Sequence, residues 1–323
     1  MVKLYPLTFE PIFKERIWGG RNLETLYGKR LPSNQKIGES WEISDRPGDE
    51  SVIAGGALRG KTLRWLMEQC PGELLGPRRP LPARFPLLIK IIDAQETLSL
   101  QVHPPAAIAE RLGGEAKTEM WYIAHAGPKA ELFVGLKKGV TRAEFERKLA
   151  SQTVAECFHR IAAKEGDAMF LPSGRVHALG AQTVIFEIQQ NSDTTYRVFD
   201  WNRVDSKGQP RELHVPQSLA SIDFTDFEPT LLPRAMTPAN PGSVRPLVRS
   251  EFFEVSLRQW AANDQLNLPA GRMKILGIVK GALRIEGAGE AVEIGAGQFC
   301  LVPGQCEATL VRAKKAVSFL DIQ

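Results

Sequence analysis

Alternating apolar and polar positions in residues 98–119 predict two strands with polar side chains on one face. Apolar residues stand at positions 98, 100 and 102, so the intervening Gln101 and His103 share the opposite face. Pro104-Pro105 ends this strand, and a short alanine-rich helical segment follows. The chain then enters a second strand at Glu119. The stretch therefore predicts an amide, an imidazole and a carboxylate on one side of two neighbouring strands.

Two further strands carry polar residues in apolar surroundings. Residues 85–94 form an apolar run that reads as a buried strand, and Lys90 lies inside it. A lysine in such a strand should either extend to solvent or line a polar cavity, and we expect the cavity. Residues 183–190 alternate, which places Glu187 and Gln189 on one face.

Helices are predicted at three places. Thr62 is placed to cap a short helix, and Thr141-x-x-Glu144 is a capping-box pattern that predicts one or two helices over 141–163. Residues 215–222 predict a third short helix. The segment 141–163 shows no candidate chemistry and is interpreted as a structural insertion.

The chain of 323 residues is longer than one compact core usually needs, so two domains are expected. Five prolines between 228 and 246 predict an interdomain linker. From about 247, short strands separated by glycine turns predict a small all-β domain, which contains no histidine. The expected fold is mainly β, with a catalytic domain over 1–240 and a small β-barrel over 241–323.

Composition and charge limit the classes of binding partner that are expected. The net charge of +4 is small, and no run of lysine and arginine suggests a nucleic acid or membrane partner. The N-terminal residues lack the apolar core of a signal peptide, and no window is apolar enough for a membrane helix. The four cysteines are scattered, which favours free thiols in a reducing cytoplasm. We expect a cytoplasmic protein with a small-molecule partner.

A second histidine extends the ligand set. His177 follows the turn residues Gly166, Pro172 and Gly174, a spacing that presents an imidazole at a strand end. Two imidazoles, a carboxylate and an amide oxygen suit Zn²⁺, with other divalent ions possible. The remaining coordination positions would be left for water or substrate.

These segments carry a family resemblance. Gly166–His177 resembles the second motif of the cupins, which are metal-binding β-barrel proteins, and positions 101, 103 and 119 look like the first. The blocks SLQVHP, KTEMWYI, LPSGRVHALG and SDTTYRVFDWNR together resemble the type I mannose-6-phosphate isomerases, in their short bacterial form. The resemblance implies an N-terminal cupin (jelly-roll) barrel with helical insertions. The C-terminal domain looks like a degenerate cupin barrel, because no histidine follows Gly297-x5-Pro303, and we expect it to bind no metal.

The resemblance also implies a function and a site. The family interconverts mannose 6-phosphate and fructose 6-phosphate with one zinc ion, which residues matching Gln101, His103, Glu119 and His177 would hold. Its catalytic arginine matches Arg197. Further active-site positions of the family fall on Ser99, Lys117 and Glu187.

The residue chemistry is compatible with this isomerisation, which moves a proton between two carbons through an enediol. The reaction needs a base, charge stabilisation and an anchor for the phosphate. Glu187, a zinc-bound water and a lysine remain alternatives for the base. The candidate phosphate partners are Lys90, Lys117, Arg197 and Arg203.

Other interpretations stay open. Arg197 could instead form a structural ion pair with Asp200 or Asp193. The chain could be a cupin oxygenase that uses Fe²⁺, which metal content and oxygen consumption would reveal. It could also be a non-catalytic module that binds a sugar phosphate without turning it over. His125, His159 and His214 have no partner pattern and are assigned no role.

Overall fold

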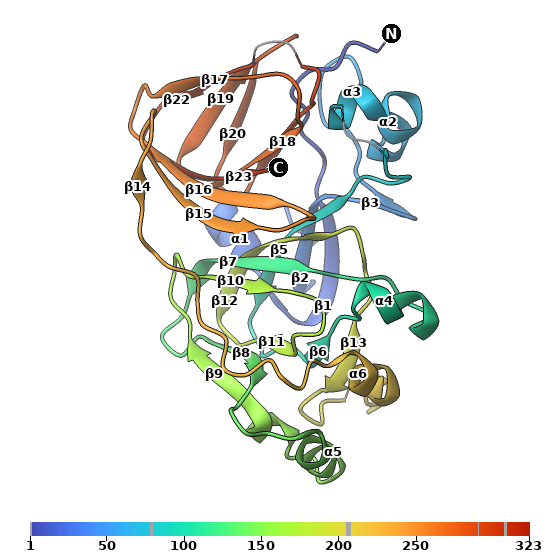
Figure 1. Ribbon diagram of the computed structural model, residues 1–323. Helices are drawn as coiled ribbons and strands as arrows, with labels where there is room; N and C mark the ends of the chain where they lie inside the picture. The colour runs from blue at the N-terminus through green and yellow to red at the C-terminus, as the bar shows by residue number, and fades with distance from the viewer. Residues whose placement is uncertain (1, 78–79, 205–207, 290, 307–308) are drawn as a thin grey trace.

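The computed structural model describes residues 2–77, 80–204, 208–289, 291–306 and 309–323. Strands are the main regular structure, and most of them form two pairs of sheets, stacked end to end in Figure 1. The prediction of a mainly β protein is confirmed. Among the described residues, no helix has the length and apolar character that crossing a membrane requires.

The N-terminal sheet pair consists of a six-stranded and a five-stranded sheet. The larger sheet has the order β1 (Ile12–Gly20), β2 (Ile37–Ile43), β5 (Leu87–Ala94), β12 (Thr183–Gln190), β7 (Glu119–Ala126) and β10 (Ala168–Leu171). The smaller has the order β13 (Tyr196–Phe199), β6 (Leu100–Val102), β11 (His177–Leu179), β8 (Glu131–Leu136) and β9 (Phe158–Ala162). Apolar side chains from both sheets pack between them, among them Trp121, Ile185 and Val134.

The C-terminal sheet pair follows the same plan. Its six-stranded sheet has the order β14 (Thr237–Pro238), β15 (Ser243–Arg249), β16 (Glu254–Trp260), β23 (Val317–Ile322), β18 (Lys274–Lys280) and β21 (Phe299–Val302). Its four-stranded sheet has the order β17 (Gln265–Leu268), β22 (Thr309–Ala313), β19 (Ala282–Glu286) and β20 (Val292–Gly295). The short strands β3 (Asp45–Arg46) and β4 (Asp49–Glu50) form a separate hairpin.

The helices are short and lie outside the sheets (Figure 1). They are α1 (Asn22–Tyr27), α2 (Leu63–Gln69), α3 (Pro71–Leu75), α4 (Ala106–Ala109), α5 (Arg142–Ala150) and α6 (Val215–Ser221), with 3₁₀ turns η1 (Glu110–Leu112) and η2 (Val154–Cys157). The predicted caps form, since the hydroxyls of Thr62 and Thr141 accept the backbone N–H groups of Trp65 and Glu144.

Two predictions of local structure are wrong in part. Residues 158–162, expected to be helical, form strand β9, because Phe158 is buried and the segment pairs with β8. Part of the expected linker is strand β15, which contains Pro246. That strand tolerates the proline at a register shift between Pro246 and Val248, where the ladder is already irregular.

The two sheet pairs share one hydrophobic core. Leu7 exchanges both backbone hydrogen bonds with Leu301 of β21, each 2.8 Å long, so the N-terminal segment adds to the C-terminal sheet pair. Leu7 and Leu301 also belong to a core cluster that continues into β5 and β12. The domain boundary between 240 and 241 therefore remains a proposal.

Arg245 fastens β15 to the N-terminal sheet pair. Its side chain is 3% exposed and donates hydrogen bonds to the carbonyl oxygens of Pro233 (2.6 Å), Gly166 (2.7 Å) and Leu232 (3.0 Å). Substitution by leucine would remove all three hydrogen bonds, whose acceptors belong to half-buried or exposed residues.

We expect Arg245→Leu to lower the free energy of unfolding by about 3 kcal/mol, because it removes three hydrogen bonds that contribute roughly 0.5–1.5 kcal/mol each. Urea denaturation measures this change. The control is Arg249→Leu on the same strand, whose side chain is 88% exposed and pairs with Glu254. It should change the free energy of unfolding by less than about 0.5 kcal/mol. Equal losses in the two variants would contradict the role given to Arg245.

Candidate active site

Two histidines and a glutamate meet between the sheets of the N-terminal pair. His103 follows β6, Glu119 opens β7 and His177 opens β11. Their potential ligand atoms all lie within 4.8 Å of one another, and the three residues are buried. The Nε2 atoms of His103 and His177 lie 3.4 and 3.3 Å from different oxygens of Glu119.

Backbone carbonyls orient both imidazoles. Nδ1 of His103 lies 2.9 Å from the oxygen of Thr194, and Nδ1 of His177 lies 2.9 Å from the oxygen of Arg175. Because a carbonyl only accepts, each Nδ1 donates, and in the neutral ring Nε2 then offers a lone pair. The hydrogen bond from Nδ1 to the carbonyl fixes the tautomer that a histidine ligand of a metal requires.

The cluster has buried ligand atoms without a partner. Nε2 of His103 and Oε1 of Glu119 have no hydrogen-bond partner among the described residues, whereas Oε2 of Glu119 forms an ion pair with the Lys117 ammonium at 3.0 Å. The amide nitrogen of Gln101, which is paired with His177 in the sheet register, lies 3.3 Å from Nε2 of that histidine. Facing acceptors in a buried site require a cation between them, so this donor set fits a divalent metal ion.

The electrostatics keep these groups in their ligand forms. Burial lowers the pKa of His103 to about 3, and the nearby Lys117 charge acts in the same direction. Burial also lowers the pKa of His177. Burial alone would raise the pKa of Glu119, but Lys117, whose ammonium lies 3.0 Å away, outweighs it and holds that pKa well below its usual range.

A cavity of about 440 Å³ opens beside the cluster. Its lining contains Gln101 of the expected metal site and the predicted catalytic or substrate-binding residues except Arg203, namely Ser99, Lys90, Lys117, Glu187 and Arg197. His103, Glu119 and His177 stand together next to it. The lining is mostly polar and contains five cationic side chains, which also include Arg16 and Arg211. Such a lining suits an anionic, hydroxylated ligand.

Glu187 is held at one oxygen and open at the other. Its Oε1 accepts a 2.9 Å hydrogen bond from Nε1 of Trp121. Its Oε2 is buried without a hydrogen-bond partner, and the Lys90 ammonium lies 3.6 Å away. Burial raises the pKa of Glu187, and the charge of Glu119 raises it further.

Arg197 faces the cavity as an unpaired cation. Its Nη1 donates to the carbonyl oxygen of Glu212 (2.7 Å), while its Nε is buried without a partner. No carboxylate among the described residues lies within 4.0 Å of it, so the alternative ion pair with Asp200 or Asp193 does not form. Asp200 is instead bound by Arg203 and Arg211.

Arg203 lies outside the set of residues that line the cavity. Its guanidinium is bound to the carboxylate of Asp200 (2.5 Å) and to the carbonyl oxygen of Thr97 (2.7 Å). It is therefore a weaker candidate for a substrate contact than the sequence suggested. His214 has a supporting position, since its Nδ1 accepts the backbone N–H of Arg197 at 3.1 Å.

Four charged lining residues were not predicted as site residues from the sequence: Arg16, Glu39, Asp193 and Arg211. The alternation of β2 puts Glu39 on the same face as Trp41, which is a usable signal for a polar position in a buried strand. Arg211 lies in an irregular segment, where no period predicts the direction of a side chain.

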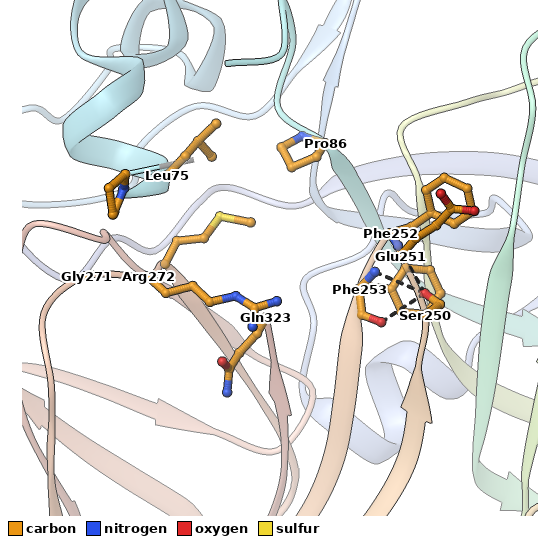
Figure 2. Close-up of a pocket in the computed structure, with 11 residues that line it drawn as sticks. Leu75, Pro86, Ser250, Glu251, Phe252, Phe253, Gly271, Arg272 and Gln323 are labelled. Carbon is orange, nitrogen blue, oxygen red and sulfur yellow. Dashed lines mark hydrogen bonds between the residues drawn. The ribbon is translucent and has the colours of Figure 1, made fainter. Parts of the chain in front are cut away.

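A separate cavity of about 350 Å³ lies away from this site, where Leu75 and Pro86 face the C-terminal sheet pair (Figure 2). Phe252, Phe253 and Met273 supply much of its wall, and its lining shares no residue with the polar cavity. It contains none of the predicted site residues.

Comparison with known proteins identifies relatives of the chain. Residues 7–145 match the family model for the type I phosphomannose isomerase catalytic domain. A probable mannose-6-phosphate isomerase of Bacillus subtilis, GmuF, is 37% identical over 302 residues, which cover 93% of each chain. The mannose-6-phosphate isomerase ManA of the same organism is 41% identical over 68% of each chain.

The structural comparison agrees with the sequence comparison. The crystal structure of a mannose 6-phosphate isomerase from Bacillus subtilis superimposes with a TM-score of 0.89 at 30% identity. The match covers 98% of this chain and 99% of the other. The similarity therefore extends over both sheet pairs.

Proposed function

The chain belongs to the type I phosphomannose isomerases, a family of enzymes with the cupin fold, and from this premise we propose that it interconverts mannose 6-phosphate and fructose 6-phosphate with one zinc ion. The observation that carries the proposal is the pair of buried atoms Nε2 of His103 and Oε1 of Glu119, which have no hydrogen-bond partner among the described residues and lie beside a cavity rich in cationic side chains. Metal ligands and anion-binding groups are both needed for this reaction on a phosphorylated sugar.

His103, Glu119 and His177 would hold the zinc ion, with Gln101 as a fourth ligand. Two neutral imidazoles and a carboxylate are a donor set that zinc prefers, and it leaves room for a further ligand. When bound, zinc supplies a Lewis acid that stabilises negative charge on a sugar oxygen. The C-terminal sheet pair is proposed to bind no metal and to have a structural role.

Glu187 is our candidate for the base. Its Oε2, which is buried without a hydrogen-bond partner among the described residues, would take the proton from C2 of the open-chain aldose and return it to C1 of the enediol. The hydrogen bond from Trp121 to the other oxygen keeps the carboxylate in one orientation. Lys117 is a less suitable base, because Glu119 raises its pKa against the effect of burial and keeps the ammonium protonated.

The cationic residues have separate tasks in this proposal. Lys117 and Arg197 lie where they can stabilise the negative charge that develops on the enediolate oxygens. The hydroxyl of Ser99, just before β6, and the ammonium of Lys90, on β5 of the opposite sheet, would contact the sugar phosphate, since both residues line the cavity. Four free, buried cysteines are compatible with the cytoplasm as the place of action.

A coupled assay of mannose 6-phosphate turnover tests the proposal. Chelation should reduce turnover at least roughly tenfold, and one equivalent of Zn²⁺ should restore it, because several kcal/mol of charge stabilisation depend on the ion. Elemental analysis should find one zinc ion per chain. A zinc-loaded protein that binds mannose 6-phosphate without turnover would be a binding module. Oxygen consumption with Fe²⁺ would instead identify an oxygenase.

A further inference from the structure

We propose that Glu39 is a positioning residue that holds the Lys90 ammonium away from Glu187 and so keeps one oxygen of Glu187 free for the substrate proton. The inference rests on the proposed function, because it uses the role given there to Glu187. Glu39 lies on β2, separated from Glu187 on β12 by the strand that carries Lys90.

The Lys90 ammonium is suspended between two carboxylates. Its Nζ lies 3.6 Å from Oε2 of Glu187 and 3.8 Å from Oε2 of Glu39. It also lies 4.8 Å from the centre of the Trp41 ring, a favourable distance for a cation–π contact. Both distances are longer than a normal hydrogen bond, so neither oxygen accepts a hydrogen bond from Lys90. All three charged side chains are nearly buried, which makes the attraction to each carboxylate strong.

Glu39 is itself fixed and ionised. Its Oε1 accepts a 2.7 Å hydrogen bond from Nε of Arg16, and its Oε2 accepts one of 2.7 Å from Nε1 of Trp41. Burial would raise the pKa of Glu39, but Lys90 and then Arg16 outweigh it and lower that pKa to about 2. Glu39 is therefore a permanent negative charge at a fixed position, on the side of Lys90 away from Glu187.

Without the charge of Glu39, the Lys90 ammonium would be attracted mainly toward Glu187. With Glu187 as the remaining carboxylate, the flexible lysine stem needs to move less than about 1 Å to bring Nζ within hydrogen-bond range of Oε2. That hydrogen bond would occupy the oxygen that the substrate proton needs. It would also stabilise the carboxylate and make it a weaker base.

The decisive variant is Glu39→Gln, which preserves the shape and one of the two acceptor oxygens but removes the charge. We expect kcat to fall about tenfold, below the full contribution of a general base, while KM stays within about twofold. Release of deuterium from C2-labelled mannose 6-phosphate should slow by the same factor. An unchanged kcat in an active protein would overturn the inference, as would a change confined to KM.

A second comparison establishes that Glu39 acts through Lys90. In a Lys90→Met background the ammonium is absent, so adding Glu39→Gln should change kcat by less than about twofold. A further tenfold loss would show that Glu39 acts on its own and would contradict the inference. If Glu39→Gln alone does not fold, the comparison of Lys90→Met with the double variant still tests the inference, because the double variant removes both buried charges together.

Glu42→Gln is the matched control. Glu42 lies on the same strand, is buried and pairs with Lys29 at 2.8 Å, but it does not line the polar cavity. Its loss should lower stability and leave kcat within about twofold of the wild type. An equal fall of kcat would show that the effect comes from distortion of β2, which would overturn the inference. A wild-type protein without mannose 6-phosphate turnover would instead contradict the proposed function.

Discussion

Replacing either His103 or His177 with alanine is expected to remove the metal ion and the activity together. Each variant leaves Glu119 with one buried imidazole partner in place of two, and a site of two strong donors holds zinc poorly. Since a Lewis acid contributes several kcal/mol to charge stabilisation, kcat should fall by roughly 1,000-fold or more.

Elemental analysis and turnover, measured on the same samples, check this expectation. His125→Ala is a suitable control, because His125 lies on β7 with Glu119 but outside the metal-ligand cluster. This control should retain one metal ion per chain and its kcat. Full metal occupancy in both the His103 and His177 variants would refute the ligand assignment.

Arg197→Ala is expected to retain zinc and the fold but to lower kcat by roughly 100-fold or more, the effect of losing one preorganised donor. The guanidinium is anchored by the carbonyl of Glu212 and has no carboxylate partner among the described residues, so its charge is available to the ligand. An enediolate carries more negative charge on oxygen than the sugar does. A fixed cation therefore stabilises the transition state more than the ground state.

Arg197→Lys should recover only part of this loss, because an ammonium cannot reproduce the planar fork of a guanidinium. Arg160→Ala is the control, since Arg160 is an exposed arginine of β9 that pairs with Glu131. It should leave kcat and KM unchanged. If Arg197→Ala raised KM alone, Arg197 would contribute uniform binding, and its assignment to the developing charge would be wrong.

The parts of the fold and site that the sequence predicted well depend on local patterns. Alternation in residues 98–103 was enough to put Gln101 and His103 on one face, and turn residues before His177 were enough to put it at a strand end. A lysine inside an apolar run is unusual, and this signal predicted that Lys90 lines a polar cavity. Lys90 does line the cavity.

The remaining features depend on contacts between distant segments. The sequence around 158–162 does not reveal that β8 offers a free edge to pair with, so a strand was mistaken for a helix. Arg197 has no carboxylate partner among the described residues because Arg203 and Arg211 form ion pairs with Asp200. Arg211 lies in an irregular segment, so the sequence does not reveal this pairing. The role inferred for Glu39 likewise depends on the strand order that puts β2 beside β5.

The pairing of Leu7 with Leu301 has a consequence for the order of events during synthesis. Leu7 leaves the ribosome long before its hydrogen-bonding partner Leu301 is made. Until then an apolar segment with unpaired backbone groups stays exposed, which is a state that favours aggregation and chaperone binding. A strand translated much later thus completes the packing of this earlier segment, and contacts this distant in sequence favour slow folding.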